Sequence, residues 1–210
     1  MRKSKKQRKY DKKRILSNRK LLKKYPWLAS DFNPWDARIW NYRKRVGYKW
    51  TWYDDFPRGW RKAFGKMMIE DIDQALKKAG KEVRDNFMVS QIKEKFGELR
   101  FYHYGGTREV DDIVEAYSVL SRNICVHCGK PDVGYLTDGW IMPICEECFK
   151  DLSTTKTYDE AISEDRKMEE VRRFRRSLPG EDGWKEYVVD ISEYAEKVRI
   201  RYVKRNRKRV

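Results

Sequence analysis

The stretch CVHCGKPDVGYLTDGWIMPICEEC, residues 125–148, contains every cysteine of the chain, as two C-x-x-C pairs separated by sixteen residues. Four thiolates suit the tetrahedral coordination that Zn²⁺ prefers, and Gly129 allows a tight turn after the first pair. A redox pair and an iron–sulfur cluster are the alternatives for such a motif. The spacing predicts a zinc ribbon with the ligands Cys125, Cys128, Cys145 and Cys148.

Four sulfur ligands leave a tetrahedral ion without an open position, so we expect this Zn²⁺ to be structural. His127 lies between two ligands and is expected at the surface. His103, the second of the two histidines, falls on a predicted strand, where packing is its commoner role. A His-Asn-His nuclease would need histidines in the loop of residues 129–144, which contains none, and we find no phosphate-binding glycine loop. We therefore expect no catalytic residue and a protein that is not an enzyme.

The residues before the ribbon predict an α+β body. In PRGWRKAFGKMMIEDIDQALKKAG, residues 57–80, apolar residues recur at steps of three and four, which predicts one amphipathic helix ending near Gly80. EVDDIVEAYSVLSRNI, residues 109–124, predicts a second helix that leads directly into Cys125. Its expected buried stripe is Val110, Ile113, Val114, Tyr117 and Leu120.

Between these helices, the stretch NFMVSQIKEKFGELRFYHYGG, residues 86–106, alternates in the manner of two strands. The alternation predicts a β-hairpin that turns near residues 95–97, with the first helix packed on it. We expect one face of this hairpin to carry Phe87, Val89, Gln91, Leu99, Phe101 and His103.

Residues 25–60 contain twelve aromatic residues, and prolines interrupt any long regular element there. We interpret this stretch as a wrapping segment anchored by buried rings, six of which are tryptophans. After the ribbon, a charged helix is expected from about residue 159 to residue 177, then a strand over residues 184–191. A helix is favoured after Ser192. The chain thus divides into a basic tail (1–24), the wrapping segment (25–60), an α+β core (61–122), the zinc ribbon (123–152), a helix-and-strand segment (153–196) and a second basic tail (197–210).

The net charge of +16 is concentrated at the two ends. Residues 1–24 carry thirteen Lys/Arg and one acid, and residues 197–210 carry eight Lys/Arg and none, so the body between them has a net charge of −4. Such ends suit a phosphate backbone, although basic tails also serve solubility and, in a eukaryote, nuclear import. We predict nucleic-acid contacts at Arg2, Lys3, Lys5, Lys6, Arg8, Lys9, Lys12, Lys13, Arg14, Arg172, Arg173, Arg175, Arg176, Arg199, Arg201, Lys204, Arg205, Arg207, Lys208 and Arg209.

No run approaches the roughly 18 apolar residues that a membrane-spanning helix needs, and the charged N-terminus is not followed by the apolar stretch of a secretory signal. We therefore expect no membrane partner and a reducing, cytoplasmic location, where clustered cysteines bind metal rather than form disulfides.

The chain combines several short motifs, namely KYPWL (24–28), GWRKAFG (59–65), QIKEKFGELRFY (91–102), Ser121, CVHCGKPDV (125–133) and GWIMPICEEC (139–148). In this combination it resembles a group of uncharacterised zinc-ribbon proteins from bacteriophages and prophages. The resemblance covers about residues 24–150 and implies a phage-encoded protein acting in the cytoplasm of a bacterial host cell. It carries over no catalytic residue, and both basic tails lie outside it.

Two functions follow as expectations. The first is non-catalytic binding of nucleic acid, a ribonucleoprotein or a polymerase through the basic tails. In that case the body should stay folded when the tails are removed. The second is binding and inhibition or modulation of a host protein, such as a bacterial defence effector, through the aromatic surface of the body.

Overall fold

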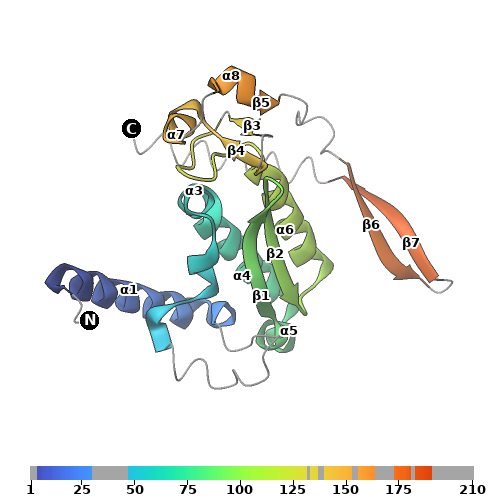
Figure 1. Ribbon diagram of the computed structural model, residues 1–210. Coiled ribbons are helices and arrows are strands. Elements are labelled where there is room, and N and C mark those ends of the chain that lie inside the picture. Colours follow the sequence, from blue (N-terminus) through green and yellow to red (C-terminus); the bar gives the residue numbers. More distant parts are fainter. Residues whose placement is uncertain are drawn as a thin grey trace.

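The computed structural model describes residues 4–29, 47–131, 133–136, 140–152, 156–163, 173–180 and 183–190. The N-terminal half is helical (Figure 1), with the elements α1 (Lys5–Lys24), η1 (Pro26–Leu28), η3 (Gly47–Lys49), η4 (Trp52–Asp55), α3 (Arg58–Trp60), η5 (Arg61–Gly65), α4 (Lys66–Ala79) and α5 (Lys81–Asn86). A hairpin, a helix and the cysteine-bearing region follow, as β1 (Met88–Lys95), β2 (Glu98–Tyr104), α6 (Arg108–Ser121), β3 (Gly134–Leu136), β4 (Met142–Ile144), α7 (Glu146–Lys150), α8 (Tyr158–Ala161) and β5 (Ile162–Ser163). The last described elements are β6 (Arg173–Gly180) and β7 (Gly183–Asp190).

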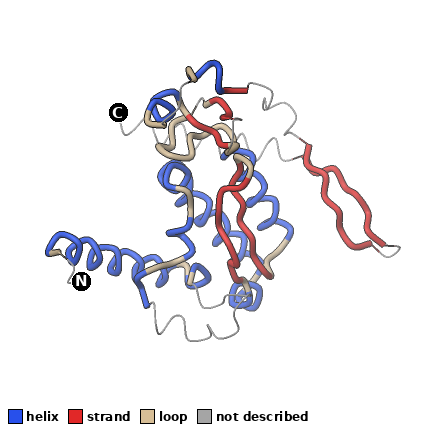
Figure 2. The backbone as a smooth tube through the Cα atoms, in the orientation of Figure 1, coloured by secondary structure: helices blue, strands red, loops and turns tan. Residues whose placement is uncertain are grey.

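The core forms where α4 and α6 cover one face of the β1–β2 hairpin (Figure 2), which confirms the predicted α+β class. The largest fully buried side chains come from both helices and from the turns before them, and include Trp60, Phe64, Met68, Ile72 and Tyr117. Two hydrogen bonds join these layers inside the core. The Tyr117 hydroxyl donates to Asp71 Oδ2 at 2.7 Å, and Leu99 N donates to Ser121 Oγ at 2.8 Å. The predicted stripe of α6 is buried except for Val114, which is half-buried.

The hairpin turns at Phe96 and Gly97, both in the left-handed region with φ of 54° and 78°, as the sequence predicts. Its register shifts between Val89 and Gln91, so one extra residue sits on β1. This bulge moves Ile92 onto the core face, where it is 3% exposed, and leaves Gln91 exposed. The expectation that Gln91 shares a face with Phe87 and Val89 is therefore wrong, because strict alternation cannot anticipate a bulge.

The helix predicted over residues 57–80 is one continuous helical run, α3–η5–α4, with a wider π-helical turn at η5. It ends at Gly80, whose φ of 107° is outside the range that a helix can continue, as predicted.

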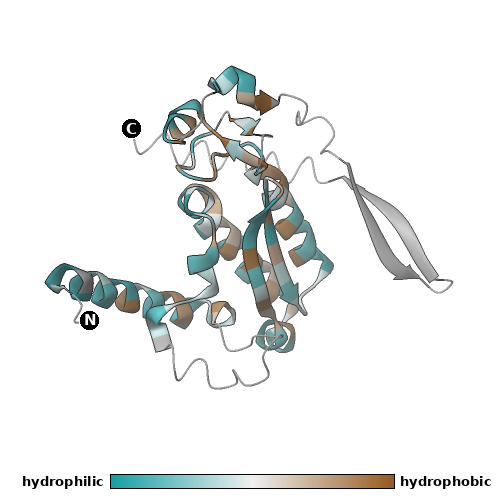
Figure 3. Cartoon of the chain, in the orientation of Figure 1, coloured by the Kyte–Doolittle hydropathy of each residue, from teal (hydrophilic) through white to brown (hydrophobic). Residues whose placement is uncertain are grey.

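The N-terminal basic segment differs from a tail, since most of it forms α1. The first half of α1 projects from the body and is mainly hydrophilic (Figure 3), whereas its second half packs against the core. Asn18 and Leu22 are 5% and 7% exposed. The Asn18 amide donates to Tyr48 O at 3.0 Å and to Asp54 Oδ2 at 3.1 Å. A helix dense in like charge is stabilised here by tertiary contacts at one end rather than by its own sequence.

A buried carboxylate connects the end of α1 to the body. Asp73 on α4, 2% exposed, accepts hydrogen bonds from Trp27 Nε1 at 3.3 Å and from Arg84 Nη2 at 2.9 Å, and it pairs with Lys77 at 2.7 Å. The same Arg84 nitrogen donates to Lys24 O at 3.1 Å. Burial opposes ionisation of Asp73, but these donors keep its pKa below the ordinary value. Trp27 and Trp60 are thus buried anchors, as predicted, while Trp35 and Trp40 lie outside the described residues.

The C-terminal prediction is only partly confirmed. The helix expected from about residue 159 has a short counterpart in α8 and is wrong over residues 173–177, which form β6. The strand predicted near 184–191 is β7, paired antiparallel with β6 from Arg173↔Asp190 to Gly180↔Gly183. A strand needs a partner for its backbone groups, and the preceding segment supplies it across a glycine-containing turn. The tail over residues 197–210 lies outside the described residues.

In the part of the chain that the structure describes, every helix is too short or too polar to cross a membrane.

Candidate metal centre and cationic helix

The four cysteines converge at one point, as their spacing predicts. Their Sγ atoms all lie within 4.8 Å of one another, and the Sγ atoms of Cys128 and Cys145 are 3.6 Å apart. Tetrahedral coordination with metal–sulfur bonds of 2.3 Å would set sulfur atoms about 3.8 Å apart. Cys125 and Cys145 are buried, whereas Cys128 and Cys148 are half-buried. The cluster therefore has the dimensions and the donor atoms of a four-coordinate metal site.

Backbone geometry prepares the first cysteine pair for this role. Gly129 N donates to Cys125 O at 2.9 Å, and its φ of 81° allows Lys130 N to approach Cys128 Sγ at 3.5 Å. Burial disfavours the Cys125 thiolate, but hydrogen bonds from the backbone of Cys128, Cys145 and His127 outweigh it and lower the Cys125 pKa to about 7. The site is thus built to carry negative charge on sulfur.

The other cysteines show why a cation is needed. Burial and the neighbouring sulfur atoms raise the pKa of Cys148 far above its ordinary range, and burial also raises that of Cys128. Four thiolates this close cannot all be ionised alone, because each charge disfavours the next. A bound cation removes this repulsion, so the donor set fits a metal ion.

The first cysteine pair is fastened to the helical run of the body. Gly59 N donates to Val126 O at 2.7 Å, and Trp60 Nε1 donates to Ile124 O at 2.7 Å. A Cβ atom on Gly59 would lie 2.2 Å from Cys125 O, and one on Gly129 would lie 2.6 Å from Gly59 O. The two backbones are therefore in direct contact. Sequence reasoning missed this role of Gly59, although a glycine beside tryptophan at a helix start is the available signal.

A second connection links the cysteine region to the hairpin turn. Glu94 Oε1 accepts a hydrogen bond from Gly97 N, and its Oε2 accepts one from Trp140 Nε1, each at 2.7 Å. The ring of Tyr135 leaves no room for a Cβ atom on Gly97, because that atom would lie 2.6 Å from Tyr135 Cε1. The hairpin tip and the cysteine region consequently support each other.

A cleft of about 320 Å³ opens beside Cys128 and Cys148. Two exposed cations, Arg58 and Lys62, border it together with His127, which is exposed as predicted. Asp151 lines the same cleft, so its border carries charges of both signs. Four thiolates around a divalent ion would leave a net negative charge, which Arg58 and Lys62 would offset in part.

His103 is a packing residue, as predicted. Its ring lies 5.0 Å from that of Phe87, its Nδ1 is 3.0 Å from Gly105 O, and its Nε2 is 3.4 Å from Asp111 Oδ1. Within the described residues, no second group of three or more His, Cys, Asp or Glu side chains is arranged to share an ion.

The predicted nucleic-acid residues fall into three groups. The first lies on α1, where the half-buried Arg14 is joined by the exposed Lys5, Lys6, Arg8, Lys9, Lys12 and Lys13. The second lies on β6, as Arg173, Arg175 and Arg176. The third falls outside the described residues, as Arg2, Lys3, Arg172, Arg199, Arg201, Lys204, Arg205, Arg207, Lys208 and Arg209. Four further cations on α1 were not predicted individually, namely Arg19, Lys20, Lys23 and Lys24.

Comparison of the chain with protein-family models, with curated proteins and with solved structures gives no match.

Proposed function

We propose that this chain is a phage-encoded, non-catalytic protein that binds nucleic acid, free or within a ribonucleoprotein or polymerase complex. Its body is stabilised by one structural Zn²⁺, and its basic segments contact phosphates. The observation that carries the proposal is α1, which has eleven Lys/Arg and one acid in twenty residues.

The choice of zinc follows from the donor set. Four cysteine sulfurs in two C-x-x-C turns, with amide groups directed at them, suit Zn²⁺ better than the oxygen-preferring Mg²⁺ or Ca²⁺. Because all four positions are filled by protein, the ion has no place for a water molecule to be activated. A structural role, coupled to folding, is the one that remains.

The shape of α1 suits a polyanion. A helix of twenty residues is about 30 Å long. Its exposed cations repeat along the projecting half, so neighbours three and four residues apart repel one another. Binding to a phosphate backbone replaces this repulsion by attraction and releases counterions, which favours association without reading base sequence.

The binding test measures salt dependence by fluorescence anisotropy with the full-length, zinc-loaded protein. Each neutralised phosphate contributes about −0.9 to the log–log slope on duplex DNA and about −0.7 on single strands, so engagement of half the charges of both basic ends predicts a slope of about −7 to −9. Replacing Lys5, Lys6, Lys9, Lys12 and Lys13 by Gln should flatten the slope by several units. A matched control replaces five exposed cations of the body by Gln, namely Lys49, Lys66, Lys78, Lys81 and Lys150, and should leave the slope unchanged.

Protein that carries no nucleic acid after purification and shows no salt-dependent binding would contradict the proposal. The alternative, binding to a host protein such as a defence effector, would then be pursued by pull-down from infected cells. Equal effects of the α1 and control substitutions would also contradict it, because they would reflect net charge rather than the cationic helix.

A further inference from the structure

The outer face of the β1–β2 hairpin gathers exposed aromatic and apolar side chains. Eight large hydrophobic side chains are exposed among the described residues, and half of them belong to this hairpin. They are Met88 at 43%, Phe96 at 57%, Tyr102 at 44% and Tyr104 at 48% exposure. A fifth, Trp140, is 66% exposed and is hydrogen-bonded to Glu94 of β1.

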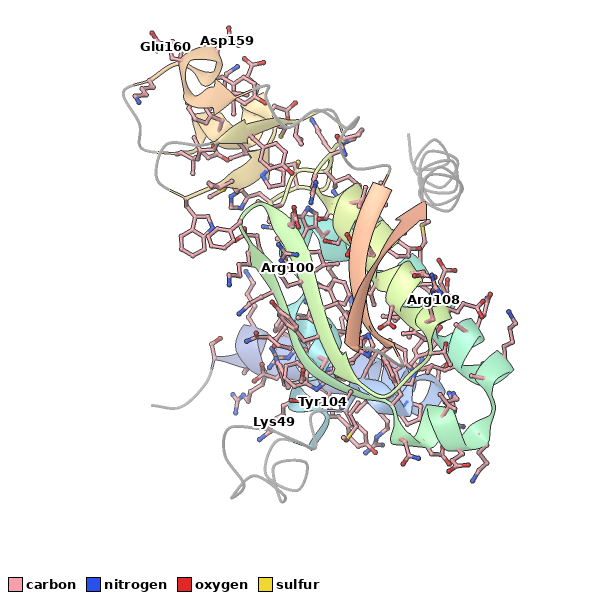
Figure 4. All side chains as sticks on the ribbon, turned by 90° about the vertical axis from the view of Figure 1, so that its right-hand side faces the viewer. Lys49, Arg100, Tyr104, Arg108, Asp159 and Glu160 are labelled. Atoms are coloured by element: carbon pink, nitrogen blue, oxygen red, sulfur yellow. The ribbon has the colours of Figure 1, made fainter. Side chains whose placement is uncertain are left out.

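The strand register places these rings in order. Tyr102 and Tyr104 are two residues apart on β2, so they point to the same face with a spacing of about 6.7 Å. Their cross-strand partners are Gln91 and Met88, both exposed. Figure 4 labels Arg100 and Tyr104 along the hairpin. The two rings therefore form a row across an open sheet surface.

Cations lie beside the Tyr102 ring, while the two carboxylates of the hairpin are engaged by neighbouring groups of the protein. Lys93 Nζ is 5.8 Å from the centre of the Tyr102 ring, and Lys93 pairs with Arg100 across the strands. Glu98 is buried against Arg122 and Arg100, and Glu94 bonds to the turn and to Trp140. The face thus offers rings and positive charge together.

We infer that this hairpin face is a stacking platform for single-stranded nucleic acid, with bases on Tyr102 and Tyr104 and phosphates near Lys93 and Arg100. The inference rests on the proposed function and narrows its substrate class. Unpaired bases expose the flat faces that aromatic rings stack on, whereas bases in a duplex are already stacked. Tyrosine is also common in strands that bind no ligand, so the contribution of the two rings to binding must be measured directly.

The test compares a labelled single-stranded oligothymidine of about fifteen nucleotides with a duplex of equal length, at about 0.15 M salt. The double variant Tyr102→Ala/Tyr104→Ala should lose about tenfold or more in affinity for the single strand. Affinity for the duplex should change less than about twofold, because phosphate contacts from the basic segments remain.

The matched control is Tyr102→Phe/Tyr104→Phe, which keeps both rings and removes only the hydroxyls. It should bind the single strand as the unmodified protein does. The melting temperature and metal content of both variants establish that they are folded. Ultraviolet crosslinking of the unmodified protein gives an independent readout, and the crosslinked peptide should contain Tyr102 or Tyr104.

Unchanged single-strand affinity in the alanine variant, with crosslinks elsewhere, overturns the platform while leaving the proposed function intact. Equal losses on single strand and duplex also overturn it, because stacking acts on unpaired bases. If the alanine variant no longer captured a host protein but bound the oligonucleotides as before, the face would belong to a protein partner instead. Absence of any nucleic-acid binding by the unmodified protein overturns both the platform and the proposed function.

Discussion

At the scale of single residues, Gly59 packs directly against the backbone of the first cysteine pair. A methyl group at Gly59 would lie 2.2 Å from Cys125 O and 2.6 Å from Val126 O, and backbone atoms cannot move aside as a flexible side chain can. Gly59→Ala should therefore separate the cysteine region from the helical run.

We expect Gly59→Ala to lower stability by more than about 2 kcal/mol and to speed release of the metal to a chromogenic chelator. Gly65→Ala is the matched control in the same run, since the closest neighbour of its new methyl group is the Tyr53 side chain, at 3.2 Å. Thermal melts and release rates measure both. Similar behaviour of the two variants would show that the close approach at Gly59 is unimportant.

Asp55 gives a pH dependence of definite sign. Burial, together with the charge of Asp54, raises the Asp55 pKa to about 6, against a hydrogen bond from Trp50 Nε1 at 2.9 Å. A folded-state pKa above the unfolded value of 3.8 means that this group stabilises the protein below about pH 4 and that the contribution is lost as the pH rises through 6.

Asp55→Asn keeps an acceptor for Trp50 and removes the charge. The variant should melt at a higher temperature than the unmodified protein at about pH 7.5, and this difference should shrink toward pH 5. Both proteins share the four cysteines, so acid release of the metal affects them alike and the difference in melting temperature remains informative. A difference that is constant over this range would refute the shifted pKa.

At the scale of elements, the sequence predicts what depends on local pattern and misses what depends on distant partners. The hairpin turn, the end of α4 at Gly80 and the stripe of α6 follow from glycine chemistry and periodicity. The four metal-site cysteines follow from their spacing alone. The bulge that exposes Gln91 and the docking of Gly59 do not, because both are set by packing between segments far apart in the chain.

The anchoring of α1 is the clearest example of this limit. Its charge density predicts a free tail, yet Asn18 and Leu22 lie in the core and Lys24 O accepts a hydrogen bond from Arg84. If residues 1–24 were a free tail, their removal would leave the body folded. The structure predicts two different outcomes for two truncations.

Removal of residues 1–14 should leave the melting temperature nearly unchanged, because the projecting half of α1 contributes little to the core. Removal of residues 1–24 should lower it substantially, since a buried leucine and a buried amide with two acceptors are lost. Thermal melts of the two truncated proteins measure this contrast. Equal melting temperatures would restore the free-tail interpretation.

At the scale of the whole molecule, the buried residues in the described part of the chain form two hydrophobic clusters. The larger runs from Leu22 to Val126 and includes the helices and the hairpin. The smaller surrounds the cysteines and includes Leu136, Ile144 and Phe149. Only the smaller cluster depends on the four sulfur atoms being held together.

Removal of the metal by a chelator should therefore unfold the smaller cluster and leave the larger one protected. Hydrogen exchange measured by mass spectrometry should show faster exchange over residues 125–152 and at the hairpin tip, with α4 and α6 changed little. Cys128→Ser should reproduce this pattern, and Ser17→Ala, at an exposed position of α1, should not. Uniform loss of protection would mean that the metal supports the entire fold.

The bond between Arg84 and the carbonyl of Lys24 spans sixty residues of sequence, and that separation has a consequence for synthesis. A ribosome that adds about 5–20 residues per second produces Arg84 some 3–12 seconds after Lys24. During that interval the segment that becomes α1 lacks its contact with Arg84, and an isolated helix of like charges is marginal in water. The nascent chain thus presents a polycationic segment to the ribosomal RNA before its body is complete, and newly made protein meets its first polyanion while still being translated.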